Sequence, residues 1–320
     1  MSMTAALPRK ALIFFARLAI VVILYAAIGR AVDLPRMTAE VTTSLVYALA
    51  GAIFLSLLQA AICTLRWSLI ARPADRVPGF RTNFLAYIEG MFVNQALPSV
   101  VGGDALRVIR WREHGVSVAD AITTVLLDRI FGVFGAAALA LAAVVLLWDA
   151  PYARYWLMLG ALASAGVLAG CALVFALSRW QRLRKVFRFS SRAACVAAEL
   201  FRFRLTRKDF SICIAYSVAV HLLSGLGALV LGRSLGIQVA APILITVTAL
   251  IVLASMIPIS LAGWGVREAG FLAVLLPLGV SAEKAVLLGV LFGLQGLLAA
   301  LMGGVSMLFG LSAPSLNSDR

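Results

Sequence analysis

Hydrophobic residues run along this chain in long stretches that few polar side chains interrupt. Six stretches are long enough to cross a bilayer as helices, because about 20 apolar residues span its hydrocarbon core. They are residues 11–28, 43–65, 122–148, 155–177, 211–231 and 284–309. The pattern predicts an all-α polytopic membrane protein, with residues 1–320 forming one integral membrane domain. The first stretch is too long for a signal peptide core, and we expect it to be retained as a helix.

Two further apolar regions, residues 82–121 and 241–283, are each broken midway by Pro, Gly and charged residues. Non-helical backbone at membrane depth is tolerated only inside protein or beside a water-filled cavity. We therefore predict a re-entrant helical hairpin in each region. An odd number of predicted spans separates the two hairpins, so they should enter from opposite faces. The sequence thus predicts an inverted repeat, as in many secondary transporters.

Positive charge is concentrated in some of the connecting loops. Residues 66–81 carry four arginines against one aspartate, and residues 178–209 carry ten basic side chains against two acidic ones. Basic loops mark the cytoplasmic side of a membrane protein. We therefore place residues 1–10, 66–81 and 178–209 inside, which gives a cytoplasmic N-terminus in the cytoplasmic (inner) membrane. The loop 178–209 should also contact anionic lipid headgroups.

Composition narrows the classes of function. The chain is 62% hydrophobic, with a mean hydropathy of +1.01 and a net charge of +14. A charge this high can indicate nucleic acid binding, but its place beside apolar spans favours lipid headgroups instead. The four cysteines and two histidines have no metal-ligand spacing, and the sequence has no phosphate-binding loop or nucleophile elbow. We expect no cofactor, no metal and no enzymatic activity.

Two short motifs resemble one another. Residues 98–107 and 258–267 share Pro, Gly and Arg at the same spacing. Each is followed by Gly-Val-Ser and a later Ala, as Gly115-Val116-Ser117 with Ala121 and as Gly279-Val280-Ser281 with Ala285. The connecting segment is four residues longer in the second copy. Matched interruptions in the two halves of a membrane protein point to a transport site.

The first motif contains the candidate site residues Asn94, Pro98, Gly102, Gly103, Asp104 and Arg107. Pro98 excludes its neighbour from helical geometry, and the two glycines permit a sharp reversal. We expect a new helix over residues 104–113, capped by Asp104, with Arg107 one turn later. Free N–H groups at a helix start beside an arginine favour an anion. The alternative is a structural turn with an interfacial arginine.

The second motif contributes Ser260, Gly263, Gly265, Arg267 and Glu268 to the candidate site. Charged residues between apolar segments must be paired, solvated or interfacial. Pairs across the repeat, Arg107–Glu268 and Asp104–Arg267, would satisfy this requirement. Asp128-Arg129 lie within another apolar run, either as substrate ligands or as a charge pair between helices, and both interpretations stay open.

Together these motifs resemble the membrane domain of the lysylphosphatidylglycerol synthase family, often called flippase-like. The resemblance covers nearly the whole chain and rests on the residues named above, although members usually carry Glu-Arg where Asp128-Arg129 stand. It implies lipid translocation or support of envelope-lipid synthesis. The two-domain synthases add an aminoacyl transferase domain after the membrane part, and since the chain ends at Arg320, we expect no lysyl transfer.

The leading hypothesis is a translocase that moves an anionic phospholipid or a lipid-linked envelope precursor. Arg107 and Arg267 would bind the lipid phosphate at one site between the two hairpins. A second hypothesis is a membrane transferase that uses Asp104, Asp128 and Glu268 as its acids and bases. A third is an accessory subunit that docks an envelope synthase through the loop 178–209, with a homo-oligomer also open.

Overall fold

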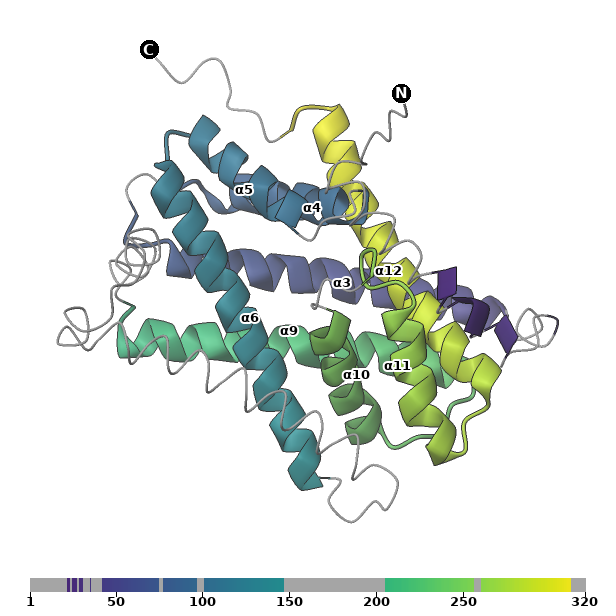
Figure 1. The fold of residues 1–320 in the computed structure, drawn as a ribbon. Helices are drawn as coiled ribbons and strands as arrows, with labels where there is room; N and C mark the ends of the chain where they lie inside the picture. Colours follow the sequence, from purple (N-terminus) through teal and green to yellow (C-terminus); the bar gives the residue numbers. More distant parts are fainter. Residues whose placement is uncertain are drawn as a thin grey trace, which may run out of the picture.

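A computed structural model describes residues 22–23, 25–27, 29–30, 35, 42–74, 77–96, 101–146, 205–255 and 260–311 (Figure 1). Its regular elements are α3 (Thr43–Ile70), α4 (Phe80–Ala96), α5 (Val101–Glu113), α6 (Val118–Leu146), α9 (Arg207–Ser234), α10 (Ala241–Ser255), α11 (Val266–Leu275), η2 (Leu276–Leu278) and α12 (Ala282–Leu308). The predicted all-α membrane class is confirmed.

Four of these helices, α3, α6, α9 and α12, are long and apolar enough to cross a membrane. They correspond to four of the six predicted spans. The span 155–177, most of the span 11–28 and nearly all of the loop 178–209 lie outside the described residues. The total of six spans therefore stays a prediction.

Helices α3 and α9 form an antiparallel pair at the centre of the described fold (Figure 1). Near the end of α3, Arg66 Nη1 donates to Ser217 Oγ at 2.9 Å, and Arg72 Nη1 lies 3.1 Å from the Asp209 carboxylate. At the other end, Leu45 belongs to the same hydrophobic cluster as Leu235. The two helices run in opposite directions and give the molecule two distinct ends.

Each predicted hairpin begins and ends at one end of this pair. Val77 and Val116, on either side of α4–α5, both pack against the cluster that contains Trp67, near the end of α3. Residues on either side of α10–α11 belong to the cluster at the opposite end of the pair, among them Val239, Val280 and Leu45. Since the hairpins start from opposite ends, the geometry favours the predicted inversion, while their depth in a bilayer stays a prediction.

The same packing scheme occurs twice among the described helices. Helix α4 packs on α12, and its counterpart α10 packs on α6. Helix α6 packs on α9, and α12 packs on α3. If α3, α4, α5 and α6 are exchanged with α9, α10, α11 and α12 in that order, each of these contacts becomes another contact of the same set. The contacts among the described helices thus follow one scheme twice, and we call α3–α6 the first unit and α9–α12 the second unit, with α3 and α9 paired at the centre.

The Gly-Val-Ser segments build the same turn in both units. Gly115 and Gly279 each have φ of 81°, a left-handed value that favours glycine. The next residue closes a Schellman turn: Val116 N–H donates to the Trp111 carbonyl, and Val280 N–H donates to the Leu275 carbonyl. The serines then accept a backbone N–H in the first turns of α6 and α12. The turn fixes the register of the repeat.

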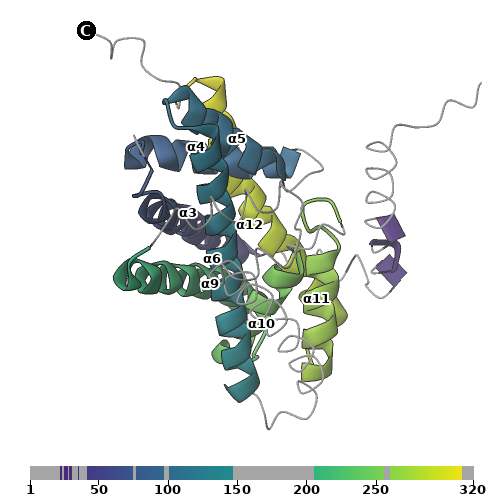
Figure 2. The ribbon, with the colours of Figure 1, turned by 60° about the vertical axis from the view of Figure 1, so that its left-hand side comes forward.

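Helix α12 presents glycines to both hairpins. Gly303 and Gly304 face α4, against the Ile88 carbonyl and the Phe92 ring. Gly289 and Gly293, nearer the start of the helix, face Glu268 and Trp264. The Gly289–Gly293 pair therefore serves close helix packing, as small residues do at helix interfaces in membranes. Figure 2 shows α12 running from the α4–α5 hairpin to α11.

Replacing Gly303 with Ala is expected to destabilise the protein by about 1–3 kcal/mol, the usual cost of overpacking. The added Cβ would overlap the Ile88 carbonyl, which is rigid backbone. Thermal unfolding in detergent measures the effect. Gly51→Ala in α3 is the control, because a Cβ there meets nothing within 4 Å. Equal midpoints for the two variants would contradict the packing argument.

Candidate functional site

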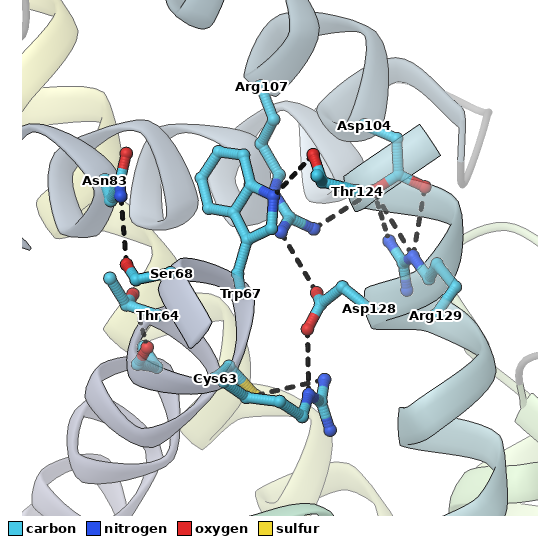
Figure 3. Close-up of polar contacts among 12 residues, drawn as sticks. Cys63, Thr64, Trp67, Ser68, Asn83, Asp104, Arg107, Thr124, Asp128 and Arg129 are labelled. Carbon is cyan, nitrogen blue, oxygen red and sulfur yellow. Dashed lines mark hydrogen bonds and ion pairs between the residues drawn. The ribbon is translucent and has the colours of Figure 1, made fainter. Parts of the chain in front are cut away.

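A buried carboxylate, Asp128, joins three helices (Figure 3). It lies on α6 with its side chain 2% exposed, and its two oxygens bind different arginines. Arg66 Nε from α3 donates at 2.8 Å, and Arg107 Nη2 from α5 donates at 3.0 Å. Taking charges out of water is costly unless they are paired and hydrogen-bonded, and this geometry provides both. Asp128 therefore fastens the first hairpin to α3 and α6.

The neighbouring residue, Arg129, binds a second carboxylate. Its Nε and Nη2 donate to Asp104 at 3.0 and 2.9 Å, a bidentate arrangement. Asp104 Oδ1 also lies 3.7 Å from Arg107 Nη1. Helix α5 begins at Val101 and not at the predicted residue 104, so Asp104 lies within its first turn. The predicted helix cap is wrong, because this carboxylate binds an arginine side chain of α6.

Aromatic rings fix Arg107 in place. Its guanidinium lies 4.0 Å from the ring centre of Trp67 and 4.8 Å from that of Tyr87. The Trp67 and Trp111 rings stack with their centres 4.4 Å apart, and the indole N–H of Trp67 donates to Thr124 Oγ1. Cations are attracted to aromatic faces, most strongly to Trp. The Arg107 guanidinium thus contacts two aromatic rings and the Asp128 carboxylate, all from the first unit, α3–α6.

The second hairpin turns through three left-handed residues, Ala262 with φ of 48°, Gly263 with 80° and Gly265 with 82°. Helix α11 then begins at Val266, and the Glu268 carboxylate accepts the Gly265 N–H at 2.6 Å. An acceptor here satisfies a donor that the helix leaves free. Ala262 is a non-glycine residue in this region, and such strain clusters at functional sites.

Arg267 is a buried cation in this turn. Its side chain donates from Nη2 to the Ala262 carbonyl at 2.9 Å and lies over the Trp264 ring. The residue is 8% exposed. Over the described ranges no carboxylate lies within ion-pair distance of it, and its Nε has no hydrogen-bond partner. Its guanidinium therefore makes no direct ion pair of the kind that Arg107 makes, and the Glu268 carboxylate acts on it only at longer range.

The tips of the two hairpins reach the same face of α12. A Cβ on Gly293 would lie 3.3 Å from the Arg267 guanidinium carbon, and one on Gly296 would lie 3.9 Å from the Gln95 amide nitrogen. These glycines are one helical turn apart. Within the described chain, Gln95 Oε1 and Ser260 Oγ are buried and lack hydrogen-bond partners, like Arg267 Nε. Unsatisfied polar atoms from both hairpins thus accompany the unpaired guanidinium.

Residues 14–304 match the family described as the lysylphosphatidylglycerol synthase TM region. The chain belongs to this family. The match spans most of the sequence and makes the protein a polytopic membrane protein linked to lipid synthesis or translocation. The comparison with curated proteins gives no match.

In this family member, Asn94 and Gly103 serve the internal packing of the first hairpin. Asn94 Oδ1 accepts the Gly103 N–H at 2.8 Å. A Cβ on Gly103 would overlap the Gly90 carbonyl, so glycine is required where α4 and α5 cross. Gly102 lies beside it in the first turn of α5, and Pro98 lies outside the described residues. Asn94 and Gly103 therefore support the hairpin, and the Asn94 side-chain oxygen is engaged within it.

The two motif arginines are not equivalent in the repeat. Counting back from the matching turns at Gly115 and Gly279 places Arg107 opposite Phe271 and Arg267 opposite Gly103. The pairs Arg107–Glu268 and Asp104–Arg267, which the sequence leaves open, do not form, because Arg107 binds Asp128 and Asp104 binds Arg129. In both observed pairs, the arginine and the carboxylate belong to the first unit.

Sequence reasoning missed two buried charges of the family member. The sequence predicts Arg66 in a cytoplasmic loop, but α3 continues to Ile70 and buries it against Asp128. Glu89 on α4 is fully buried and accepts from Arg110 Nε at 2.8 Å and from Ser306 Oγ at 2.7 Å. The apolar residues after Arg66, and the place of Glu89 inside an apolar region, are the signals that could have found them.

Proposed function

We propose that this protein translocates a lipid with a negatively charged phosphate group, either an anionic phospholipid or a lipid-linked envelope precursor, across the cytoplasmic membrane. The observation that carries the proposal is the unpaired, buried guanidinium of Arg267. An intramembrane charge is costly without a partner, and such residues mark substrate pathways. A lipid phosphate supplies the missing negative charge. The tails would stay in the bilayer.

The repeated architecture supports movement of the lipid and not only its binding. The two four-helix units meet at α3–α9, and the first hairpin helix of each, α4 or α10, packs on the long final helix of the other. Rocking of such units about a site at their interface exposes it to alternate sides of the membrane. Arg267 and Gln95 reach that interface on α12 from different hairpins. The basic loop 178–209 would draw anionic headgroups toward the cytoplasmic entrance.

The state of the three candidate acids favours translocation over group transfer. Asp128 binds two arginines, and Asp104 binds Arg129 in a bidentate pair. Glu268 Oε2 accepts the backbone N–H that begins α11. A general acid or base must be able to reach the proton that it transfers. Both aspartates are thus engaged by arginines, whereas Glu268 uses only one of its two oxygens and its Oε1 is buried without a hydrogen-bond partner.

Arg267→Gln is expected to lower transport of fluorescent phosphatidylglycerol in proteoliposomes by at least roughly tenfold, the effect of losing one charge-assisted contact. The assay measures the fraction of lipid that becomes accessible to a membrane-impermeant quencher. Arg112→Gln is the control, because Arg112 is an exposed arginine of α5. Transport by Arg267→Gln at the wild-type rate would refute the proposal, and a changed headgroup mass would support the transferase.

A further inference from the structure

The ion-pair network of the first unit has more positive than negative groups. Arg66, Arg107 and Arg129 face only two carboxylates, Asp104 and Asp128, within the described part of the chain (Figure 3). One positive charge is therefore left over between α3, α5 and α6. A surplus charge in a weakly polar environment attracts an anion. The network is complete only with one more negative group.

The surplus is accessible at one edge of the network. The Asp128 side chain is 2% exposed, whereas those of Arg129 and Asp104 are 38% and 22% exposed. Arg129 uses Nε and Nη2 for Asp104, and its Nη1 makes no hydrogen bond to the described residues. Arg107 Nη1 lies 3.7 Å from the same carboxylate. An incoming anion would thus meet two guanidinium groups at the place that Asp104 occupies.

We infer that Arg129, with Arg107 behind it, is a binding site for a phosphate group, and that Asp104 is a tethered competitor that fills the site when it is empty. Arginine binds carboxylate and phosphate through the same bidentate geometry, so one can replace the other. Asp104 loses little when displaced, because it is partly exposed and lies in the first turn of α5, where the helix dipole favours negative charge.

Asp128 would hold Arg66 and Arg107 in place during this exchange, because its own bonds are separate from those of Asp104. The site lies in the first unit and does not involve Arg267. It therefore does not depend on the proposed lipid transport. Its phosphate could belong to a lipid headgroup or to a free anion, and the experiment separates these two sources.

Binding is measured as the rise in thermal unfolding midpoint of the full chain in nonionic detergent. One series adds inorganic phosphate against chloride at equal ionic strength, and the other adds short-chain phosphatidylglycerol against the matching diacylglycerol. We expect a rise for the wild type in at least one series. Asp104→Asn should bind the active probe roughly tenfold more tightly, because the competing charge is gone. Arg129→Gln should lose the rise with inorganic phosphate, and Arg129→Gln combined with Arg267→Gln should lose the rise with phosphatidylglycerol that Arg267→Gln alone retains.

Two variants separate this site from other arginines. Arg112→Gln should keep the wild-type response in both series. Arg267→Gln should keep the response to inorganic phosphate and the part of the phosphatidylglycerol response that depends on Arg129, so loss of transport by Arg267→Gln leaves the result unaffected. Arg129→Lys keeps the charge without the bidentate geometry and should bind the phosphate probe more weakly than the wild type. This variant replaces Arg129→Gln if Arg129→Gln does not fold. The inference is overturned if no probe raises the midpoint, if Asp104→Asn binds no more tightly than the wild type, or if Arg129→Gln responds fully.

Discussion

Replacing Asp128 with Asn is expected to destabilise the protein by about 3–5 kcal/mol, because it removes one member of a buried ion network and leaves the others unpaired. The carboxylate is 2% exposed and receives a hydrogen bond from Arg66 and another from Arg107. An Asn side chain keeps the shape but loses the charge. Both guanidinium groups would then remain buried with much less compensation. Thermal or denaturant-induced unfolding in detergent measures the loss.

Asp104→Asn is the matched control for this prediction. It makes the same chemical change in the same network, but Asp104 and its partner Arg129 are 22% and 38% exposed. Because this pair is less buried than the Asp128 network, its loss should cost less than that of Asp128→Asn. Losses of equal size in the two variants would show that burial does not decide the cost.

The long helices were predictable because a bilayer demands long apolar segments, and α3, α6, α9 and α12 lie where the hydrophobic runs lie. The end of α3 was not. Arg66 follows an apolar run and was assigned to the loop, although the helix extends to Ile70. A sequence shows the charge of an arginine but not its partner. Asp128, which allows Arg66 to be buried, lies on another helix.

The repeat was predictable where its chemistry is local. Gly115 and Gly279 supply the left-handed residue of a Schellman turn, and Ser117 and Ser281 cap the next helix, so these residues encode the same turn wherever they occur. The ion pairs could not be predicted in this way. They depend on which helices meet in the fold. The two Pro–Gly–Arg motifs also suggest that Arg107 and Arg267 occupy matching positions, and in the structure they do not.

Replacing Arg267 with Met is expected to raise the stability of the lipid-free protein by about 1–3 kcal/mol, because apolar replacement of a poorly compensated buried charge removes its desolvation penalty. The variant loses the hydrogen bond to the Ala262 carbonyl, which costs about 1 kcal/mol. The Met side chain can still pack against Trp264. Sites that bind charged ligands are often kept at the expense of stability.

The same substitution at Arg107 should have the opposite sign. Arg107 is also buried, but it binds Asp128 and lies over Trp67, so Arg107→Met leaves a buried carboxylate with one partner fewer. We expect its unfolding midpoint to fall while that of Arg267→Met rises, both measured in detergent without added lipid. Adding phosphatidylglycerol should then stabilise the wild type more than Arg267→Met. A fall for both variants would mean that Arg267 already has a compensating partner, and the basis for placing a lipid phosphate there would be lost.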